Sequence, residues 1–90
     1  MKFVWDEPKR QGNIDLHQMD FEDVYEFDWD GAQVTPTYPS QTGRQRLIAT
    51  GWLRGDLVTI IISPLGTEGY SVVSMRSASR KERRGYEERE

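Results

Sequence analysis

Basic side chains that suit phosphate binding gather in the last fifth of the chain. Arg76 ends an alternating stretch with strand periodicity, and Arg80 begins a charged stretch with helical spacing. The planar guanidinium group fits bidentate contact with a phosphate, and a strand end just before a helix is a rigid place to hold it. Arg76 is therefore our first candidate for a phosphate clamp, with Arg80 beside it. An ion pair between Arg76 and Glu22 or Asp23 is the competing interpretation, and the two roles are compatible.

The charged stretch after Arg76 offers further contacts. Arg80, Arg83 and Arg84 share one stripe of a helix, and each phosphate that they neutralise would add to the salt dependence of binding. An ordinary solvated face, with Glu87 pairing with Arg83, explains the same pattern. Tyr86 could stack on a base or pack the helix onto a sheet, and we favour packing.

Proton transfer has one natural candidate. His17 is the only histidine, and only histidine has an unperturbed pKa near neutrality. A helix C-terminal cap is the other interpretation of His17. Lys9 is either a further phosphate contact or a surface lysine, and Glu22 either a base or a first-turn carboxylate. The chain has no cysteine, so a closed zinc site is excluded in practice, and we predict neither a metal nor a cofactor.

The charge of the chain is polarised. Its net charge is −3, yet residues 1–30 carry nine acids against three bases, and residues 76–90 carry six bases against four acids. The pattern indicates either two solvated faces, or an acidic side for a basic partner and a basic patch for phosphate. The N-terminus has no apolar leader and no apolar run is long enough for a membrane span, so we expect a soluble cytoplasmic protein.

The elements that must position these side chains follow from periodicity and end signals. We expect a short strand over residues 3–5 and a helix over about 7–16, with Asp6 as its N-cap. A second helix should begin after Asp20, its N-cap, because Phe21 and Val24 have helical spacing. An edge strand near residues 33–35 and a mobile loop follow.

Three strands are predicted next, over residues 45–53, 57–63 and 70–76. The continuous apolar run of residues 57–63 is typical of a central strand, and Gly55-Asp56 is expected at the turn before it. Ser79 and Glu82 form a capping box, so the last helix should begin near Arg80 and fray after Tyr86. Together these elements predict one α+β domain over residues 1–90: a small antiparallel sheet of three to four strands, with two N-terminal helices and a C-terminal helix packed on one face.

The order of several short motifs resembles a known family. The opening FVWDEPK, then Asn13, His17 and Phe21-Glu22, is similar to the start of BrnT-type toxins. The middle, with Arg46, Gly51 and the segment 54–58, and the ending VSMRSASRKERRGYEE are similar to that family too. The resemblance covers nearly the whole chain, and residues 32–45 are the least similar part.

The resemblance implies a RelE-like fold and a metal-independent endoribonuclease toxin of a type II toxin–antitoxin system. It implies an RNA substrate and a BrnA-like DNA-binding antitoxin as partners, with operator DNA bound only through the antitoxin. Catalysis would involve Arg76 and Arg80 at the phosphate and His17 in proton transfer. The residues that would contact RNA are Lys9, Arg46, Arg83 and Tyr86.

Two other functions compete with this one. A catalytically silent toxin-like module that acts only within an antitoxin–operator repressor complex would explain the negative net charge and Leu16, where the family usually has lysine. A plain RNA- or protein-binding domain without an operon partner is the third interpretation.

Overall fold

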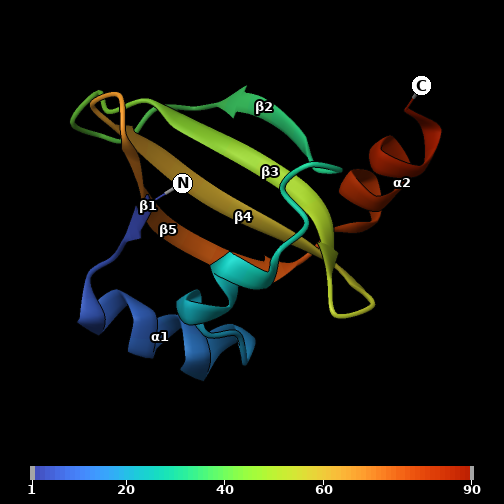
Figure 1. Cartoon of the computed structure of the whole chain (residues 1–90), viewed down its shortest axis with the longest axis horizontal. Helices are drawn as coiled ribbons and strands as arrows, with labels where there is room; N and C mark the ends of the chain where they lie inside the picture. The colour runs from blue at the N-terminus through green and yellow to red at the C-terminus, as the bar shows by residue number, and fades with distance from the viewer. Residues whose placement is uncertain (1, 90) are drawn as a thin grey trace.

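One five-stranded sheet organises the chain, with its strands in the order β1-β5-β4-β3-β2 (Figure 1). The structure, a computed structural model, describes residues 2–89. Strands β2 to β5 form an antiparallel meander, and β1 lies parallel to β5 at the edge. The elements in chain order are β1 (Lys2–Val4), α1 (Glu7–His17), η1 (Phe21–Glu26), β2 (Gln33–Thr37), β3 (Arg46–Leu53), β4 (Asp56–Leu65), β5 (Gly69–Ser77) and α2 (Arg80–Glu88).

The α+β class is confirmed, but the predicted sheet of three to four antiparallel strands is wrong. The sheet has five strands and is mixed, because β1 joins it next to the last strand of the chain. Alternation along a sequence identifies a strand but does not name its partner. The predicted central strand is confirmed, since β4 lies between β5 and β3.

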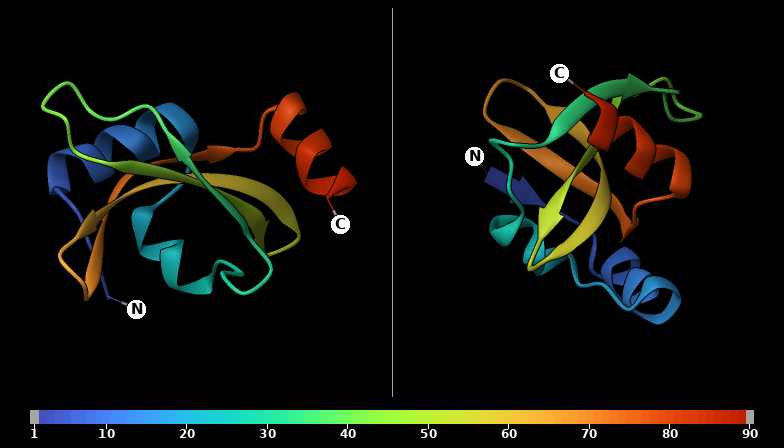
Figure 2. Two further views of the ribbon diagram at one scale, coloured as in Figure 1. Left: turned by 90° about the horizontal axis from the view of Figure 1, so that it is seen from above. Right: turned by 90° about the vertical axis from the view of Figure 1, so that its right-hand side faces the viewer.

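The hydrophobic core lies between η1 and one face of the sheet; we call the opposite face the open face. Figure 2 shows η1 on one side of the sheet and α2 towards the other. Cross-strand neighbours Ala49, Ile60 and Met75 form the centre of the core face, and each is completely buried. The side chains that cover them from η1 and the residue after it are Phe21, Val24 and Phe27.

The second helix is a 3₁₀ helix, where the sequence predicts an α-helix. Its N-cap is Asp20, as expected, and its apolar residues explain the tighter winding. Phe21, Val24 and Phe27 recur every three residues, which is the period of a 3₁₀ helix, and all three are buried. Tyr25, which an α-helical face would have buried, is 58% exposed.

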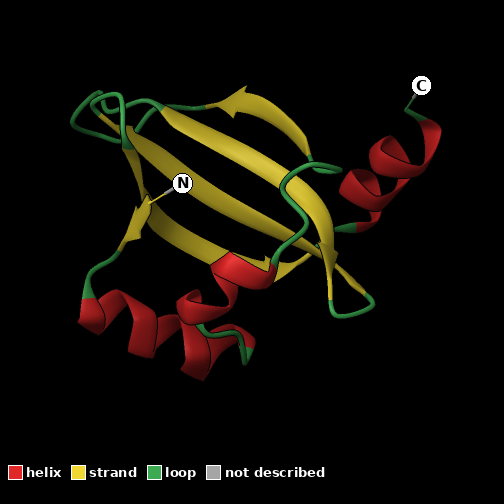
Figure 3. Ribbon diagram, viewed as in Figure 1, coloured by secondary structure: helices red, strands yellow, loops and turns green. Residues whose placement is uncertain are grey.

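The helices do not pack together on one face, so that part of the prediction is also wrong (Figure 3). α1 lies along β5, and its only buried residue is Asn13. The Asn13 side-chain amide donates to the Met75 carbonyl at 2.8 Å, and its oxygen accepts from the Met75 N–H at 3.1 Å. Since β1 ends opposite Ser71, Asn13 satisfies backbone groups of β5 that no strand reaches.

The β3–β4 turn differs by one residue from the expected one. Leu53 pairs with Asp56, so Arg54 and Gly55 are the two central residues, in place of Gly55-Asp56. Both have positive φ, 48° and 86°, as a two-residue type I′ turn requires. The Arg54 side chain forms ion pairs with Asp23 and Glu26 of η1, which connect the turn to that helix.

The last helix begins as predicted. The Ser79 capping box is present with both of its hydrogen bonds, and α2 runs to Glu88, two residues past the expected fraying point. None of the helices within residues 2–89 has the length and apolar character needed to cross a membrane.

Candidate functional site

Arg76 lies on the open face near the end of β5, and a carboxylate from α2 holds it there. Its Nη1 and Nη2 atoms donate to the two oxygens of Glu82 at 2.7 and 2.9 Å. This ion pair corrects the expected partners, since Glu22 pairs with Arg10 and Asp23 with Arg54. The sequence predicts Glu82 only as a residue of the capping box. Its carboxylate both caps α2 and pairs with Arg76.

Glu82 accepts two more hydrogen bonds, from the Ser79 N–H and from the Thr59 hydroxyl, both at 2.8 Å. The Thr59 hydroxyl therefore donates its only proton to Glu82. The neighbouring Thr50 hydroxyl, 3.0 Å away, must then donate to Thr59. Both threonines are buried. The result is a polar row across three strands that fixes the carboxylate, and through it the guanidinium of Arg76.

The electrostatics of this pair limit its chemistry. The hydrogen bonds from Arg76 lower the pKa of Glu82 to about 2, with smaller contributions from Ser79 and Thr59. The same bonds raise the pKa of Arg76 above its usual value. Glu82 is therefore a carboxylate at neutral pH that already accepts four hydrogen bonds, and it is unsuited to act as a base.

One edge of the Arg76 guanidinium group remains open. Glu82 takes the edge formed by Nη1 and Nη2, and Nη1 also donates to the Ser77 carbonyl at 3.3 Å. Among the contacts of residues 2–89, none uses Nε of Arg76. The Nε–H and the remaining Nη2–H form a second fork, which can bind two oxygens of a phosphate while Glu82 keeps the group in place.

The other predicted residues of the C-terminal segment have different surroundings. Arg80 and Arg83 are exposed on α2. Tyr86 is buried; its ring packs edge-on against Trp52 at 6.1 Å between centroids, and its hydroxyl donates to the Gly31 carbonyl at 3.3 Å. Arg89 covers the ring, 3.7 Å from its centroid. In this arrangement Tyr86 attaches α2 to the sheet.

His17 is the last residue of α1 and is half-buried. It shares one stripe of the helix with Lys9 and Asn13, at intervals of four residues. Lys9 faces Ser71 and Val73 in a small pocket, and Asn13 binds Met75. Successive turns of α1 therefore lie beside successive residues of β5, and the two elements run in the same direction. Four helical residues rise about 6 Å and two strand residues about 6.6 Å, so we expect the last turn of α1 to lie towards the Arg76 end of β5. Within residues 2–89 no hydrogen bond joins His17 to Arg76 or Arg80.

The pocket beside Lys9 contains further bases. Arg46, predicted as an RNA contact, lines it together with Arg44, which sequence reasoning missed. The pocket lies on the open face, towards the opposite end of β5 from Arg76. The structure therefore separates the predicted residues into two basic places, one at the β5–α2 corner and one at this pocket.

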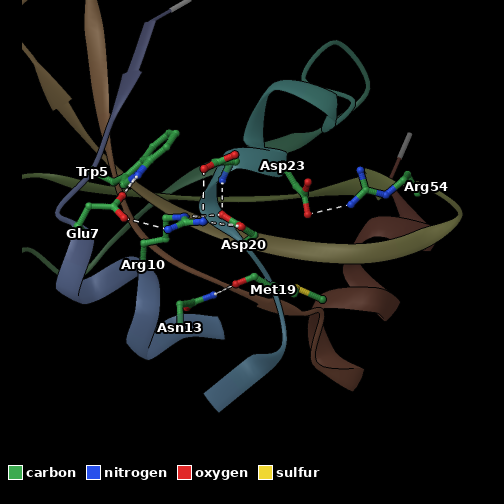
Figure 4. A network of polar contacts seen from close by, with 9 residues as sticks. Trp5, Glu7, Arg10, Asn13, Met19, Asp20, Asp23 and Arg54 are labelled. Carbon is green, nitrogen blue, oxygen red and sulfur yellow. Dashed lines mark hydrogen bonds and ion pairs between the residues drawn. The ribbon is translucent and has the colours of Figure 1, made fainter. Parts of the chain in front are cut away.

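The acidic residues near the N-terminus have partners of their own. The Arg10 guanidinium donates to both oxygens of Asp20 at 2.8 and 3.0 Å and also pairs with Glu7 and Glu22 (Figure 4). The hydrogen bonds from Arg10 lower the pKa of Asp20. In the described part of the chain, no group of three His, Asp or Glu side chains is arranged to hold a metal ion.

Comparison with known proteins gives one consistent family. A family model described as ribonuclease toxin, BrnT, of type II toxin–antitoxin system matches residues 5–82. The structure is similar to the crystal structure of the Brucella abortus ribonuclease toxin BrnT, with a TM-score of 0.75 and 46% sequence identity; the match covers 89% of this chain and 99% of that one. A search of curated proteins found no match.

Proposed function

Because this chain belongs to the BrnT family of ribonuclease toxins of type II toxin–antitoxin systems, we propose that it is an endoribonuclease whose open sheet face holds the RNA. In this proposal cleavage needs no metal. A BrnA-like DNA-binding antitoxin neutralises the enzyme, and operator DNA is bound only through that antitoxin. The enzyme acts in the cytoplasm.

The observation that carries the proposal is the open edge of Arg76. A single arginine is oriented by a bidentate pair with Glu82, yet it keeps a second two-donor fork on an accessible sheet face. Such an arrangement is preorganised, since the guanidinium needs no rearrangement when charge develops on a phosphate. Arg80, exposed at the first turn of α2, supplies a second cation at the same corner.

The reaction that these groups support is transfer of the phosphate to the neighbouring 2′-hydroxyl. The 2′-oxygen attacks phosphorus and loses its proton, the bond to the 5′-oxygen breaks, and that oxygen takes up a proton. The products are a 2′,3′-cyclic phosphate and a 5′-hydroxyl. Arg76 and Arg80 stabilise the negative charge of the intermediate, and His17 transfers a proton.

The remaining predicted residues have roles in holding the strand. Lys9 and Arg46 contact the RNA backbone at the far end of the open face, and Arg83 does so at α2. Tyr86 supports binding by fixing α2 against Trp52, and its direct contact with RNA stays a prediction.

An assay of purified protein with single-stranded RNA and EDTA tests the proposal. Wild type should cleave the RNA, and Arg76→Ala should lower the rate about 10²–10³-fold, the usual effect of removing a transition-state donor. Arg76→Lys keeps the charge but loses the fork, so it should also be slow. Lys2→Gln, which removes a positive charge at β1, is the control. The ribonuclease assignment is wrong if wild type leaves RNA intact and causes no growth arrest when it is expressed without its antitoxin.

A second candidate function is a catalytically silent module that acts only within a repressor complex. It is favoured by the ion pair itself, because Glu82 already neutralises Arg76. Arg76→Ala separates the two functions. An enzyme would lose toxicity and keep its antitoxin affinity, whereas a silent module would show no toxicity to lose.

A further inference from the structure

Three basic side chains from three separate elements converge on one small pocket of the open face. Lys9 comes from α1, Arg44 from the loop between β2 and β3, and Arg46 from the start of β3. The pocket has a volume of about 80 Å³. Its hydroxyl-bearing lining residues are Ser40, Ser63 and Ser71.

No carboxylate balances these charges. The ion pairs of residues 2–89 involve Arg10, Arg54 and Arg76, and none of them includes a basic residue of the pocket. The pocket lining contains no acid, although the chain has 15 acidic residues and 12 basic ones. Bringing like charges together is unfavourable, so an anion bound between them would stabilise the arrangement.

The loop that carries Arg44 is held in place by its own hydrogen bonds. The Arg44 N–H donates to the Ser40 hydroxyl at 2.9 Å, and the Ser40 N–H donates to the Arg44 carbonyl at 2.9 Å. Gly43 completes the turn with a positive φ of 83°. The Ser63 hydroxyl then donates to the Gln45 carbonyl at 2.7 Å, which fixes the loop to β4. These bonds fix the backbone from which the Arg44 and Arg46 side chains project.

The size of the pocket restricts the ligand. With a volume of about 80 Å³, the pocket has room for a small anion such as one phosphate group. The hydroxyl of Ser71 makes no hydrogen bond within the described residues, so it is available as a donor. Three cations and a hydroxyl match the oxygens of a phosphate.

We propose that this pocket binds one phosphate of the RNA strand whose cleavage site lies at Arg76, and so sets the register of the strand. The inference rests on the proposed function. From Ser71 and Val73 to Arg76 the distance along β5 is roughly 10 to 16 Å, at ~3.3 Å per residue. A mononucleotide cannot occupy both places, so the site selects oligonucleotides.

Binding of inorganic phosphate to the full chain tests the pocket apart from catalysis. In NMR titrations, phosphate should shift the amide signals of Ser71, Val73 and Arg46 in wild type. Arg44→Gln should weaken phosphate binding roughly tenfold, the effect of losing one charge-assisted contact. Arg46→Gln is a second variant, since Arg44 is exposed and Arg46 half-buried. Lys2→Gln, which makes the same charge change outside the pocket, should bind phosphate as wild type does.

Binding of 2′-O-methyl oligoribonucleotides, which have no 2′-hydroxyl to react, identifies the source of the phosphate. With oligonucleotides long enough to span the open face, Arg44→Gln should reduce the slope of log K against log salt by about 0.7, the value for one phosphate contact on a single strand.

The outcomes separate the two proposals. Weaker phosphate binding together with a smaller salt slope for the oligonucleotide in Arg44→Gln supports the inference. Phosphate binding without any effect on RNA overturns the role in RNA register and leaves a site for a free phosphate. If phosphate shifts no pocket signal, the site does not exist, even where wild type cleaves RNA. If the pocket binds phosphate and RNA but the RNA is never cleaved, the ribonuclease proposal and the role in setting the cleavage register fail, and the pocket is a binding site for an RNA phosphate only.

Discussion

Substitution of Glu82 by glutamine gives the sharpest test of how the corner between β5 and α2 is built. The change keeps the size of the side chain and removes its charge. Glu82 accepts four hydrogen bonds, two from Arg76 and one each from Ser79 and Thr59. A glutamine amide nitrogen cannot accept any of them, so at least one of these donor groups would face the amide N–H₂ of glutamine and lose its hydrogen bond. We therefore expect a loss of stability, even though α2 keeps its other capping bond, in which the N–H of residue 82 donates to the Ser79 hydroxyl.

The size of that loss can be estimated from the pKa of Glu82. A decrease from 4.5 to about 2 corresponds to about 3 kcal/mol at 1.36 kcal/mol per pKa unit. Water reaches both partners, since 18% of the Glu82 side chain and 32% of the Arg76 side chain are exposed. Screening should reduce the contribution to about 2 kcal/mol. For a domain of this size that is a melting temperature lower by roughly 8–16 °C.

The pH dependence gives an independent check. Because the pKa of Glu82 is lower in the folded state, the unfolded state binds its proton first as the pH falls. The stabilisation is therefore complete above the unfolded pKa of about 4.5 and is lost as the pH approaches 2. Urea unfolding of wild type and Glu82→Gln should differ by a constant free energy from pH 8 to about 5.5. Roughly half or more of that difference should be lost by pH 3.

Glu87→Gln is the matched control, since Glu87 is exposed on the same helix and has no ion pair within residues 2–89. It should unfold within about 0.5 kcal/mol of wild type. The reasoning is refuted if Glu82→Gln is equally stable at pH 7. It is also refuted if the difference between Glu82→Gln and wild type does not change between pH 6 and pH 3, because the carboxylate would then not be the stabilising group.

Four further substitutions test other parts of the structure. Asn13→Asp should cost about 2–3 kcal/mol in urea unfolding, because a carboxylate cannot donate to the buried carbonyls that the amide now binds. Gly51→Ala should cost about 1–3 kcal/mol, since its Cβ would lie 2.9 Å from Cζ of Phe27; Gly12→Ala, with open space at that position, should stabilise α1 by about 0.5–1 kcal/mol. His17→Gln should lower RNA cleavage at pH 7 about 10²–10⁴-fold, while the melting temperature stays close to that of wild type; unchanged cleavage would exclude His17 from proton transfer.

Local signals explain why most elements could be predicted. Alternation identified the strands of the meander, and the capping residues Asp6 and Ser79 fixed two helix starts within a residue. The pairing of β1 with β5 could not be predicted, because it joins the two ends of the chain and depends on the whole meander forming. The 3₁₀ winding of η1 did have a signal, the three-residue spacing of Phe21, Val24 and Phe27.

Local sequence signals also predict one part of the candidate site. The corner between Arg76 and Arg80 followed from strand and capping patterns alone. To predict the pairing of Arg76 with Glu82 from the sequence, one must recognise that a carboxylate in a capping box can accept further hydrogen bonds. The pocket could not be predicted, because Arg44 reaches it only through the turn at Gly43 that folds the loop back to β4.

The net charge of −3 is a poor guide to whether this chain binds RNA. The acids of η1 and the residue before it pair with Arg10 and Arg54, on the side of the sheet away from the open face. On the open face the pocket cations have no carboxylate partner within residues 2–89, and Arg76 keeps a free fork. An RNA strand meets the local field of the face that it approaches, and within a few ångströms that field outweighs the total charge. The negative total therefore does not favour a silent module. It leaves an acidic surface for a basic partner on one side of the sheet and a basic surface for phosphates on the other.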